Sequence, residues 1–274
     1  MMSLFGALLL VGPAFAQELA LPALSPRAEV MQQVGVVDVT VNYASPAKRE
    51  RTVWGDVVKY DELWRTGANT ATTFETTGDL VVGGKPVPAG KYSIFSIPGK
   101  DSWTVILNKN PNQGGTAQYE EAQDQVRIQV KPEAGAERER LTFLFSGTTD
   151  AATNLELEWA GVRVAVPITV DTKAMVGKSI DGYVAGAADT LADAARFKAD
   201  NGDVDGALKL IDASIAVNES WYNTWLKADL LHTKGDNKNA YKLAQKAQTM
   251  GTAAGDGFFW KDRVEKALAE WKKK

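Results

Sequence analysis

The chain has 274 residues, no cysteine and a single histidine, His232. A disulfide framework and a thiolate nucleophile are therefore excluded, and a catalytic triad or a histidine zinc site would depend on that one imidazole. The net charge of −3, from 31 basic and 34 acidic side chains, argues against a nucleic-acid binder, which usually carries a basic excess.

Residues 1–16 have the pattern of a secretory signal peptide. They carry no charged side chain, and residues 4–11 are almost wholly apolar. Ala14-Phe15-Ala16 gives the small-x-small site that signal peptidase cleaves, which predicts a mature chain beginning at Gln17. The alternative is a buried amino-terminal helix. No segment reaches about 18 apolar residues, so we expect a periplasmic or secreted protein without a membrane span.

Residues 25–170 are predicted to form an antiparallel β-sandwich or jelly roll. In residues 37–43 valines alternate with polar side chains, and the β-prone runs 91–97 and 102–107 flank the turn residues Pro98-Gly99, which predicts a hairpin. Further short runs with turn signals between them occur at residues 71–74, 125–130, 141–145, 155–159 and 162–170. A β-barrel is the alternative, because alternation does not distinguish the two.

The stretch from Trp54 to Asn69 is unlike a strand, because it gathers aromatic and polar side chains around two glycines. Tyr60 and Trp64 offer flat faces, while Arg65 and Asn69 offer hydrogen-bond donors. These four residues are the candidate ligand-binding residues, for a polar small molecule such as a glycan or a carboxylate. The competing interpretation is structural, since tryptophan usually fills a core and a loop arginine often binds loop carbonyls.

The same region resembles a bacterial domain-of-unknown-function family, number 2911. The match covers residues 25–170, and its most specific parts are Trp64-Arg65-Thr66-Gly67-Ala68-Asn69 and Ala89-Gly90-Lys91-Tyr92-Ser93. Where the family often has Lys-Gly-Arg, this chain has Arg49-Glu50-Arg51. Members look like exported proteins, but the resemblance implies no known activity, so it assigns no catalytic residue.

Residues 180–274 change to a helical pattern that repeats. Gly202-Asp203 recurs as Gly235-Asp236 after 33 residues, and Ala195 recurs as Ala228. This segment resembles the tetratricopeptide repeat, in which Gly-Asp marks the turn before the second helix of each unit. Two units and a closing helix over residues 258–271 would fill the segment, giving an α+β protein with a β domain and a helical repeat tail.

A calcium loop is the competing interpretation of the first Gly-Asp turn. Asn201, Asp203 and Asp205 alternate before Gly206, with Asp212 at the twelfth position, which nearly matches an EF-hand. The first ligand would be neutral, however, and the twelfth would be the shorter aspartate instead of glutamate. The repeat explains the turn better, so no metal site is predicted.

Paired carboxylates raise the alternative of a carboxylate-dependent hydrolase, which needs two acids across a cleft. Glu156 and Glu158 alternate with leucines, which indicates a solvent face instead. No P-loop or dinucleotide fingerprint is present, so no cofactor is predicted. The acidic groups are Asp61-Glu62, Glu120-Glu121 with Asp124, and Glu156 with Glu158.

The interpretation that we favour is a non-enzymatic binding or scaffold protein, with a protein partner held by the helical repeats. Trp225, Trp260 and Trp271 are the candidate partner-binding residues, on the expectation that they lie exposed on a concave face. A small-ligand module and a hydrolase remain the alternatives.

Overall fold

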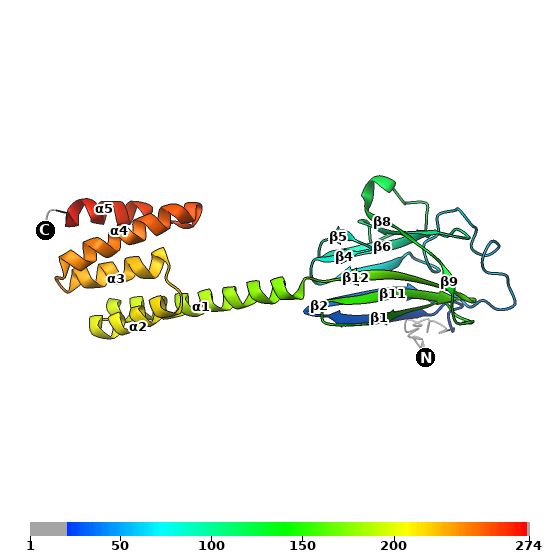
Figure 1. The fold of residues 1–274 in the computed structure, drawn as a ribbon, viewed down its shortest axis with the longest axis horizontal. Coiled ribbons are helices and arrows are strands. Elements are labelled where there is room, and N and C mark those ends of the chain that lie inside the picture. Colours follow the sequence, from blue (N-terminus) through cyan, green and yellow to red (C-terminus); the bar gives the residue numbers. More distant parts are fainter. Residues whose placement is uncertain (1–20, 273–274) are drawn as a thin grey trace, which may run out of the picture. The chain divides into compact units, whose positions relative to one another are not determined.

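The computed structural model of the chain describes residues 21–272. It divides into a β unit that ends at Thr172 and a helical unit that begins at Lys173 (Figure 1). Helix begins about eight residues before the predicted change at residue 180. The predicted signal peptide lies outside the described residues. Among the described helices, none is long and apolar enough to cross a membrane.

The described strands of the β unit form two antiparallel sheets of six strands each (Figure 1). The first sheet has the order β1 (Arg27–Val34), β2 (Val37–Ala44), β3 (Thr72–Thr76), β6 (Gly90–Ile97), β7 (Trp103–Asn108) and β8 (Asp124–Val130). The second has the order β10 (Thr142–Ser146), β11 (Ala152–Trp159), β12 (Val162–Thr169), β4 (Leu80–Val82) and β5 (Lys85–Val87), with β9 (Glu133–Ala134) paired to β12.

The two sheets pack face to face as a sandwich. Ile94 and Trp103 from the first sheet, with Leu157 and Val164 from the second, line one shared cavity of about 20 Å³. These four side chains are buried, as the period-two pattern requires of inward positions. The predicted antiparallel sandwich is therefore confirmed, and the pairing of the described strands leaves two separate sheets where a barrel would have one.

Turn chemistry sets the register at two hairpins. β6 and β7 pair antiparallel around the predicted turn, with Ser96 opposite Val105. The β4–β5 turn contains Gly83 and Gly84, whose φ angles of 56° and 79° fall in the left-handed region that two-residue hairpins need. A Cβ on Gly83 would also overlap Ile128.

The prediction that Glu156 faces solvent is wrong. Glu156 is only 2% exposed, and its carboxylate accepts two hydrogen bonds from Arg163 on β12. The Ser146 hydroxyl donates a further bond. These hydrogen bonds, that of Arg163 foremost, hold the pKa of Glu156 below its ordinary value. A glutamate can alternate with leucines and still be buried because a paired arginine follows it on the next strand.

The helical unit, as far as residue 272, contains five α-helices with two equivalent corners. Asp203 caps α2 by accepting a bond from Gly206 N at 2.8 Å, and Asp236 caps α4 by accepting one from Asn239 N at 3.2 Å. The 33-residue recurrence therefore marks two helix starts with the same cap. The tetratricopeptide assignment itself stays a prediction. The helices are α1 (Thr172–Asp200), α2 (Val204–Val217), α3 (Trp221–Thr233), α4 (Asn237–Ala254) and α5 (Lys261–Trp271).

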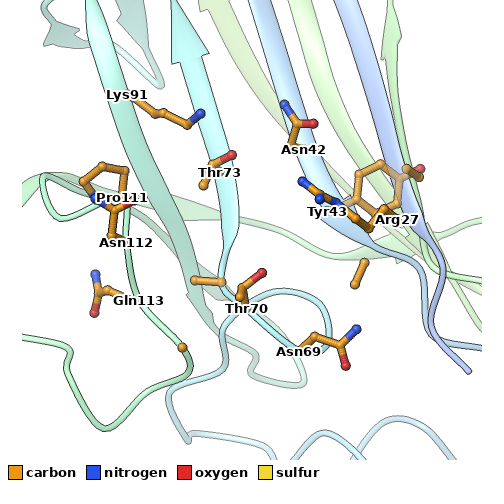
Figure 2. Close-up of a pocket in the computed structure, with 14 residues that line it drawn as sticks. Arg27, Asn42, Tyr43, Asn69, Thr70, Thr73, Lys91, Pro111, Asn112 and Gln113 are labelled. Atoms are coloured by element: carbon orange, nitrogen blue, oxygen red, sulfur yellow. The ribbon is translucent and has the colours of Figure 1, made fainter. Parts of the chain in front are cut away.

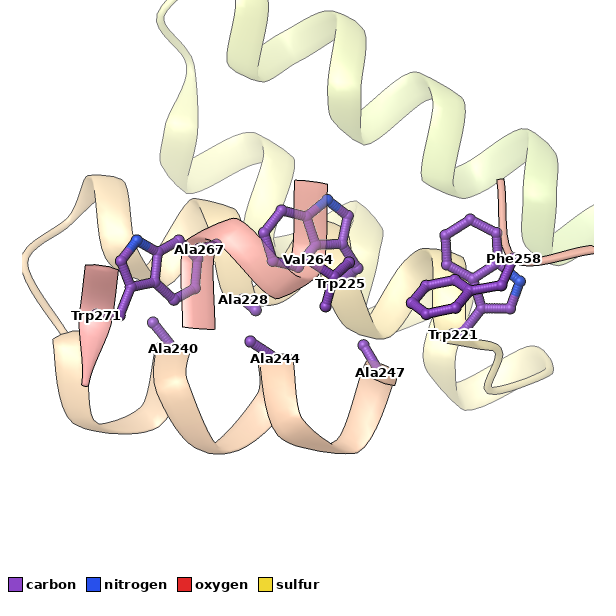
Figure 3. Packing of buried hydrophobic residues seen from close by; sticks show 10 residues of the cluster. All are labelled: Trp221, Trp225, Ala228, Ala240, Ala244, Ala247, Phe258, Val264, Ala267 and Trp271. Carbon is purple, nitrogen blue, oxygen red and sulfur yellow. The ribbon is translucent and has the colours of Figure 1, made fainter. Parts of the chain in front are cut away.

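Large aromatic side chains fill this unit opposite small alanines. Figure 3 shows Trp225 and Trp271 above Ala240 and Ala244 of α4. The two indoles stack, with ring centroids 5.6 Å apart and planes 9° from parallel. The alanines let α3 and α4 approach closely, and the tryptophans occupy the space that remains between these helices and α5.

Candidate functional site

The loop that carries Trp64 and Arg65 is fixed to strand β6. Trp64 N donates to Ser96 O at 2.8 Å, and Ser96 N donates to Trp64 O at 2.9 Å. The Thr66 and Ser96 hydroxyls lie 2.9 Å apart and are buried. Thr66 has a φ of 52°, which turns the chain sharply after Arg65. The backbone of Arg65 is therefore held on both sides.

Trp64 belongs to a cluster of the four tryptophans of the β unit. Its ring stacks on Trp159, with centroids 6.3 Å apart and planes 21° from parallel. Trp54 packs edge-on against Trp103 and Trp159 at 5.0 and 5.8 Å. The Trp64 indole N–H donates to Gly67 O at 3.1 Å. The structural interpretation of Trp64 thus accounts for its indole N–H and for part of its ring.

Three arginines surround a hollow of about 300 Å³ beside this cluster. We call it the arginine hollow; it is lined by Arg49, Arg51, Arg65, Trp64 and Trp159 among others. Arg51 donates from Nη2 to Ala47 O at 2.7 Å and from Nε to Lys48 O at 3.1 Å, which holds its guanidinium in place. Only Arg65 of the three arginines was predicted as a site residue. Arg49 and Arg51 come from a turn that hydrophobic periodicity does not describe.

Arg65 has an unusual environment. Its Nε is buried and has no hydrogen-bond partner in the structure. The competing interpretation, in which Arg65 binds loop carbonyls, therefore does not account for this nitrogen. A buried donor without an acceptor costs free energy, and such groups call for an explanation in function or in an absent partner.

The structure does not bring the four predicted ligand-binding residues together. Tyr60 lines a separate hollow of about 40 Å³ with Trp54 and Trp103. Asn69 donates from Nδ2 to Ser25 O at 3.4 Å and lines a third, larger hollow. Trp64 and Arg65 alone share one space.

The third hollow has a volume of about 690 Å³, and its lining combines amide and hydroxyl side chains with the cations Arg27 and Lys91 (Figure 2). We call it the amide hollow. Asn42 on β2 lies opposite Thr73 on β3, and both lie on the face of the sheet away from the sandwich core. Gln113 donates from Nε2 to Asn108 Oδ1 at 3.0 Å, while its Oε1 is buried without a partner. The volume suits a small molecule.

Of the residues that line the amide hollow, only Asn69 was predicted from the sequence as a site residue. Asn42 and Thr73 are outward residues of alternating strands, where polar side chains are ordinary. Gln113 lies in the long connection between β7 and β8. Only the meeting of these strands with that loop distinguishes the residues, and no spacing in the sequence shows it.

The expectation that Trp225 and Trp271 are exposed is wrong, since they are 1% and 6% exposed. The core of the helical unit needs their volume opposite its alanines. Trp260 is half-buried and lines a hollow of about 240 Å³ between α1, α3 and α5. We call this hollow the helical groove; its side chains include Arg196, Leu226, Asp229, Trp260 and Arg263. Arg263 lies over the Trp260 ring at 5.1 Å and pairs with Asp229 at 3.0 Å.

The segment that nearly matches an EF-hand, Asn201 to Asp212, contains the start of helix α2. Asp203 caps α2 and pairs with Lys198 at 2.6 Å, and α2 begins at Val204 within the supposed loop. Asn201 donates its amide to Phe197 O at 2.8 Å. Over residues 21–272 no cluster of three acidic, histidine or cysteine side chains could hold a metal ion.

His232 stacks on Trp271 at 4.3 Å, with its Nδ1 2.6 Å from Asn237 Oδ1.

The candidate catalytic carboxylates lie outside the three hollows. Asp124 accepts bonds from Asn108, Tyr119 and Arg127 at 2.7 to 2.9 Å. Burial and then the bond to Asp124 raise the pKa of Tyr119 to about 12. Asp124 and Glu156 thus hold neighbouring side chains of the fold, and none of the acidic groups considered for a hydrolase lines the arginine hollow, the amide hollow or the helical groove.

Comparison with known proteins gives one match. The family model described as "Protein of unknown function (DUF2911)" matches residues 25–168, which is more than half of the chain. The match covers the β unit from just before β1 to within one residue of the end of β12, and with it nearly all of the residues that line the arginine hollow and the amide hollow. No curated protein and no solved structure matches the chain significantly. The resemblance that the Trp-Arg-Thr-Gly-Ala-Asn motif indicated is confirmed, and the chain belongs to the DUF2911 family.

Proposed function

We propose that this chain is an exported, non-enzymatic binding protein whose helical unit takes a protein partner. The predicted signal peptide of residues 1–16 supports a periplasmic or secreted location. The two equivalent Gly-Asp corners support a tetratricopeptide-like tail of two units and a closing helix. Stacked helical repeats commonly present a concave surface to a partner.

The observation that carries this proposal is the helical groove. It gathers Trp260, Arg196 and Arg263, which are the residue types that dominate protein-binding hot spots. Leu226 supplies an apolar floor, and the Arg263–Asp229 pair fixes one guanidinium over the indole. A protruding side chain of a partner would fit such a half-apolar, half-charged space.

The test compares partner capture by the tagged full chain and by two variants. Trp260→Ala should lose the captured partner in quantitative mass spectrometry of envelope extracts. Lys242→Ala, which changes an exposed side chain of α4, should retain the partner. Circular dichroism establishes that both variants fold. Equal capture by wild type and Trp260→Ala would reject the groove as the partner site.

Export is tested separately, by fractionation and amino-terminal sequencing. The mature protein should be found outside the cytosol and should begin at Gln17. A cytosolic protein that retains residues 1–16 would contradict the proposal.

A second candidate function is the binding of a polar ligand, such as a short glycan, in the amide hollow. Its volume of about 690 Å³ and the amides and hydroxyls in its lining favour this function. The melting temperature should rise with maltotriose or with an N-acetylglucosamine oligomer, and Asn42→Ala should weaken the shift. No observation in the three hollows favours the hydrolase alternative.

A further inference from the structure

We propose that the arginine hollow binds an oxyanion, namely a phosphate, sulfate or carboxylate group carried on a small molecule. Arg49, Arg51 and Arg65 all line a single space of about 300 Å³. The proposal concerns a site in the β unit, so it goes beyond the proposed partner groove and stands or falls independently of it.

Among the described residues, no acidic side chain forms an ion pair with Arg49, Arg51 or Arg65. No acidic side chain of residues 21–272 lines the hollow either. Two acids lie beside the turn that carries Arg49: Glu137 pairs with Lys48, and Glu139 accepts the backbone N–H of Arg49 at 2.7 Å, without an ion pair to its guanidinium. Since like charges repel, three arginines around one small space favour an anion between them.

Part of the hydrogen-bonding capacity of these three arginines has no partner among the described residues. A guanidinium has five N–H donors in a planar fork that matches an oxyanion in bidentate geometry. Arg51 spends two of its nitrogens, Nη2 and Nε, on the turn carbonyls of Ala47 and Lys48. The buried Nε of Arg65 has no acceptor at all. An oxyanion supplies the acceptor that the described residues do not.

The site is held in position before any ligand arrives. Arg65 lies between Trp64 and Thr66, and both are hydrogen-bonded to Ser96 of β6. The turn carbonyls fix Arg51. Binding therefore orders few side chains, which leaves more of the interaction energy for affinity.

The tryptophans indicate what carries the oxyanion. Half-buried Trp64 gives the same hollow an apolar wall, and Trp159, which is only 1% exposed, stacks against Trp64. The Trp64 indole N–H is already bonded to Gly67 O. This wall offers a ring face instead of a donor. It suits the body of a small organic anion, while the arginines take its charged group.

The test measures binding of stated probes to the full chain by calorimetry. The charged probes are phosphate, pyrophosphate, glucose 6-phosphate and citrate, and glucose is the neutral control. We expect saturable binding of glucose 6-phosphate that weakens as NaCl is raised, and no binding of glucose. Tighter binding of glucose 6-phosphate than of phosphate would place the sugar against Trp64, and citrate binding would show that the hollow accepts carboxylates.

Matched variants connect the binding to the hollow. Arg51→Gln and Arg65→Lys should each weaken binding by about tenfold or more. The glutamine removes the positive charge of Arg51, and the lysine keeps the charge of Arg65 but loses its planar fork of donors. Lys109→Gln removes one exposed positive charge of the same unit and should bind as wild type. If Arg65→Lys fails to fold, Arg49→Gln on the exposed rim replaces it. The proposal is overturned if no charged probe binds, or if the arginine variants bind as tightly as Lys109→Gln.

Discussion

Arg163 binds Glu156 through two nitrogens, Nε to Oε2 and Nη2 to Oε1, each at 2.6 Å. The pair joins β11 to β12, and the Glu156 side chain is only 3% exposed. In this pair the guanidinium of a structural arginine donates its hydrogen bonds to a buried carboxylate. The three arginines of the arginine hollow lack such a partner among the described residues, which separates the two kinds of arginine.

The Glu156 pair predicts a specific acid sensitivity. Because the folded-state pKa of Glu156 is lowered, its stabilising contribution is complete above the unfolded pKa of about 4.3 and is lost as pH falls through the folded value. Glu156→Gln should therefore lower the urea midpoint at pH 7, and its difference from wild type should shrink below about pH 4. Glu121→Gln, whose carboxylate is exposed, should change the midpoint little. An unchanged difference between pH 7 and pH 3 would contradict this account.

Trp271 is predicted to be a core residue of the helical unit and not a contact for a partner. Trp271→Ala should lower the free energy of unfolding by about 3–5 kcal/mol, because it leaves a cavity against Trp225 and His232. Phe259→Ala should cost less than about 1 kcal/mol, since Phe259 is 69% exposed. Urea unfolding measures both. If both variants lost a similar free energy of unfolding, the contrast between buried Trp271 and exposed Phe259 would be contradicted.

The Asp236 cap predicts local fraying of α4. Asp236→Ala should lower stability by about 1 kcal/mol, because the N–H of Asn239 loses its acceptor. Hydrogen exchange should quicken most in the first turn of α4. Asp236→Ser keeps a capping oxygen and should restore most of the protection. Uniformly faster exchange along α4 would argue against a local cap effect.

Two helix glycines are predicted to respond to alanine in opposite directions. Gly182 in α1 has open space where a Cβ would stand, so Gly182→Ala should stabilise the protein by about 0.5–1 kcal/mol. At Gly251 in α4 a Cβ would overlap the Phe258 ring, so Gly251→Ala should destabilise it by about 1–3 kcal/mol. Thermal unfolding measures both variants. If their melting temperatures shift in the same direction from that of wild type, the close approach of Phe258 to α4 is rejected.

The strands and helices follow from local patterns wherever one face is buried. Residues 37–43 alternate in the sequence and form β2, and the Gly-Asp pairs mark the starts of α2 and α4. β1 is harder to identify, because Met31 and Gln32 interrupt its alternation. It is a strand because it pairs with β2 along its whole length. Tertiary pairing here overrides a weak local preference.

The site residues depend more on where loops meet than on local patterns. Arg65 is recognisable from its motif, but Arg49 and Arg51 join it only because the turn that carries them folds back beside Trp64. In the helical unit, a signal for burial was present. Trp221, Trp225 and Ala228 fall on one helix face, which is the spacing of a core stripe. This spacing outweighs the expectation that Trp225 faces a partner.

The central claim, that the arginine hollow takes an oxyanion, is tested most directly by nitrogen-15 NMR of the arginine Nε–H and tryptophan indole groups. On titration with glucose 6-phosphate at constant ionic strength, the signals of Arg65 and Trp64 should shift together and saturate. The signals of Arg163 and Trp225, which lie outside the hollow, should stay in place. No shift at Arg65, or equal shifts at all four groups, would contradict the claim.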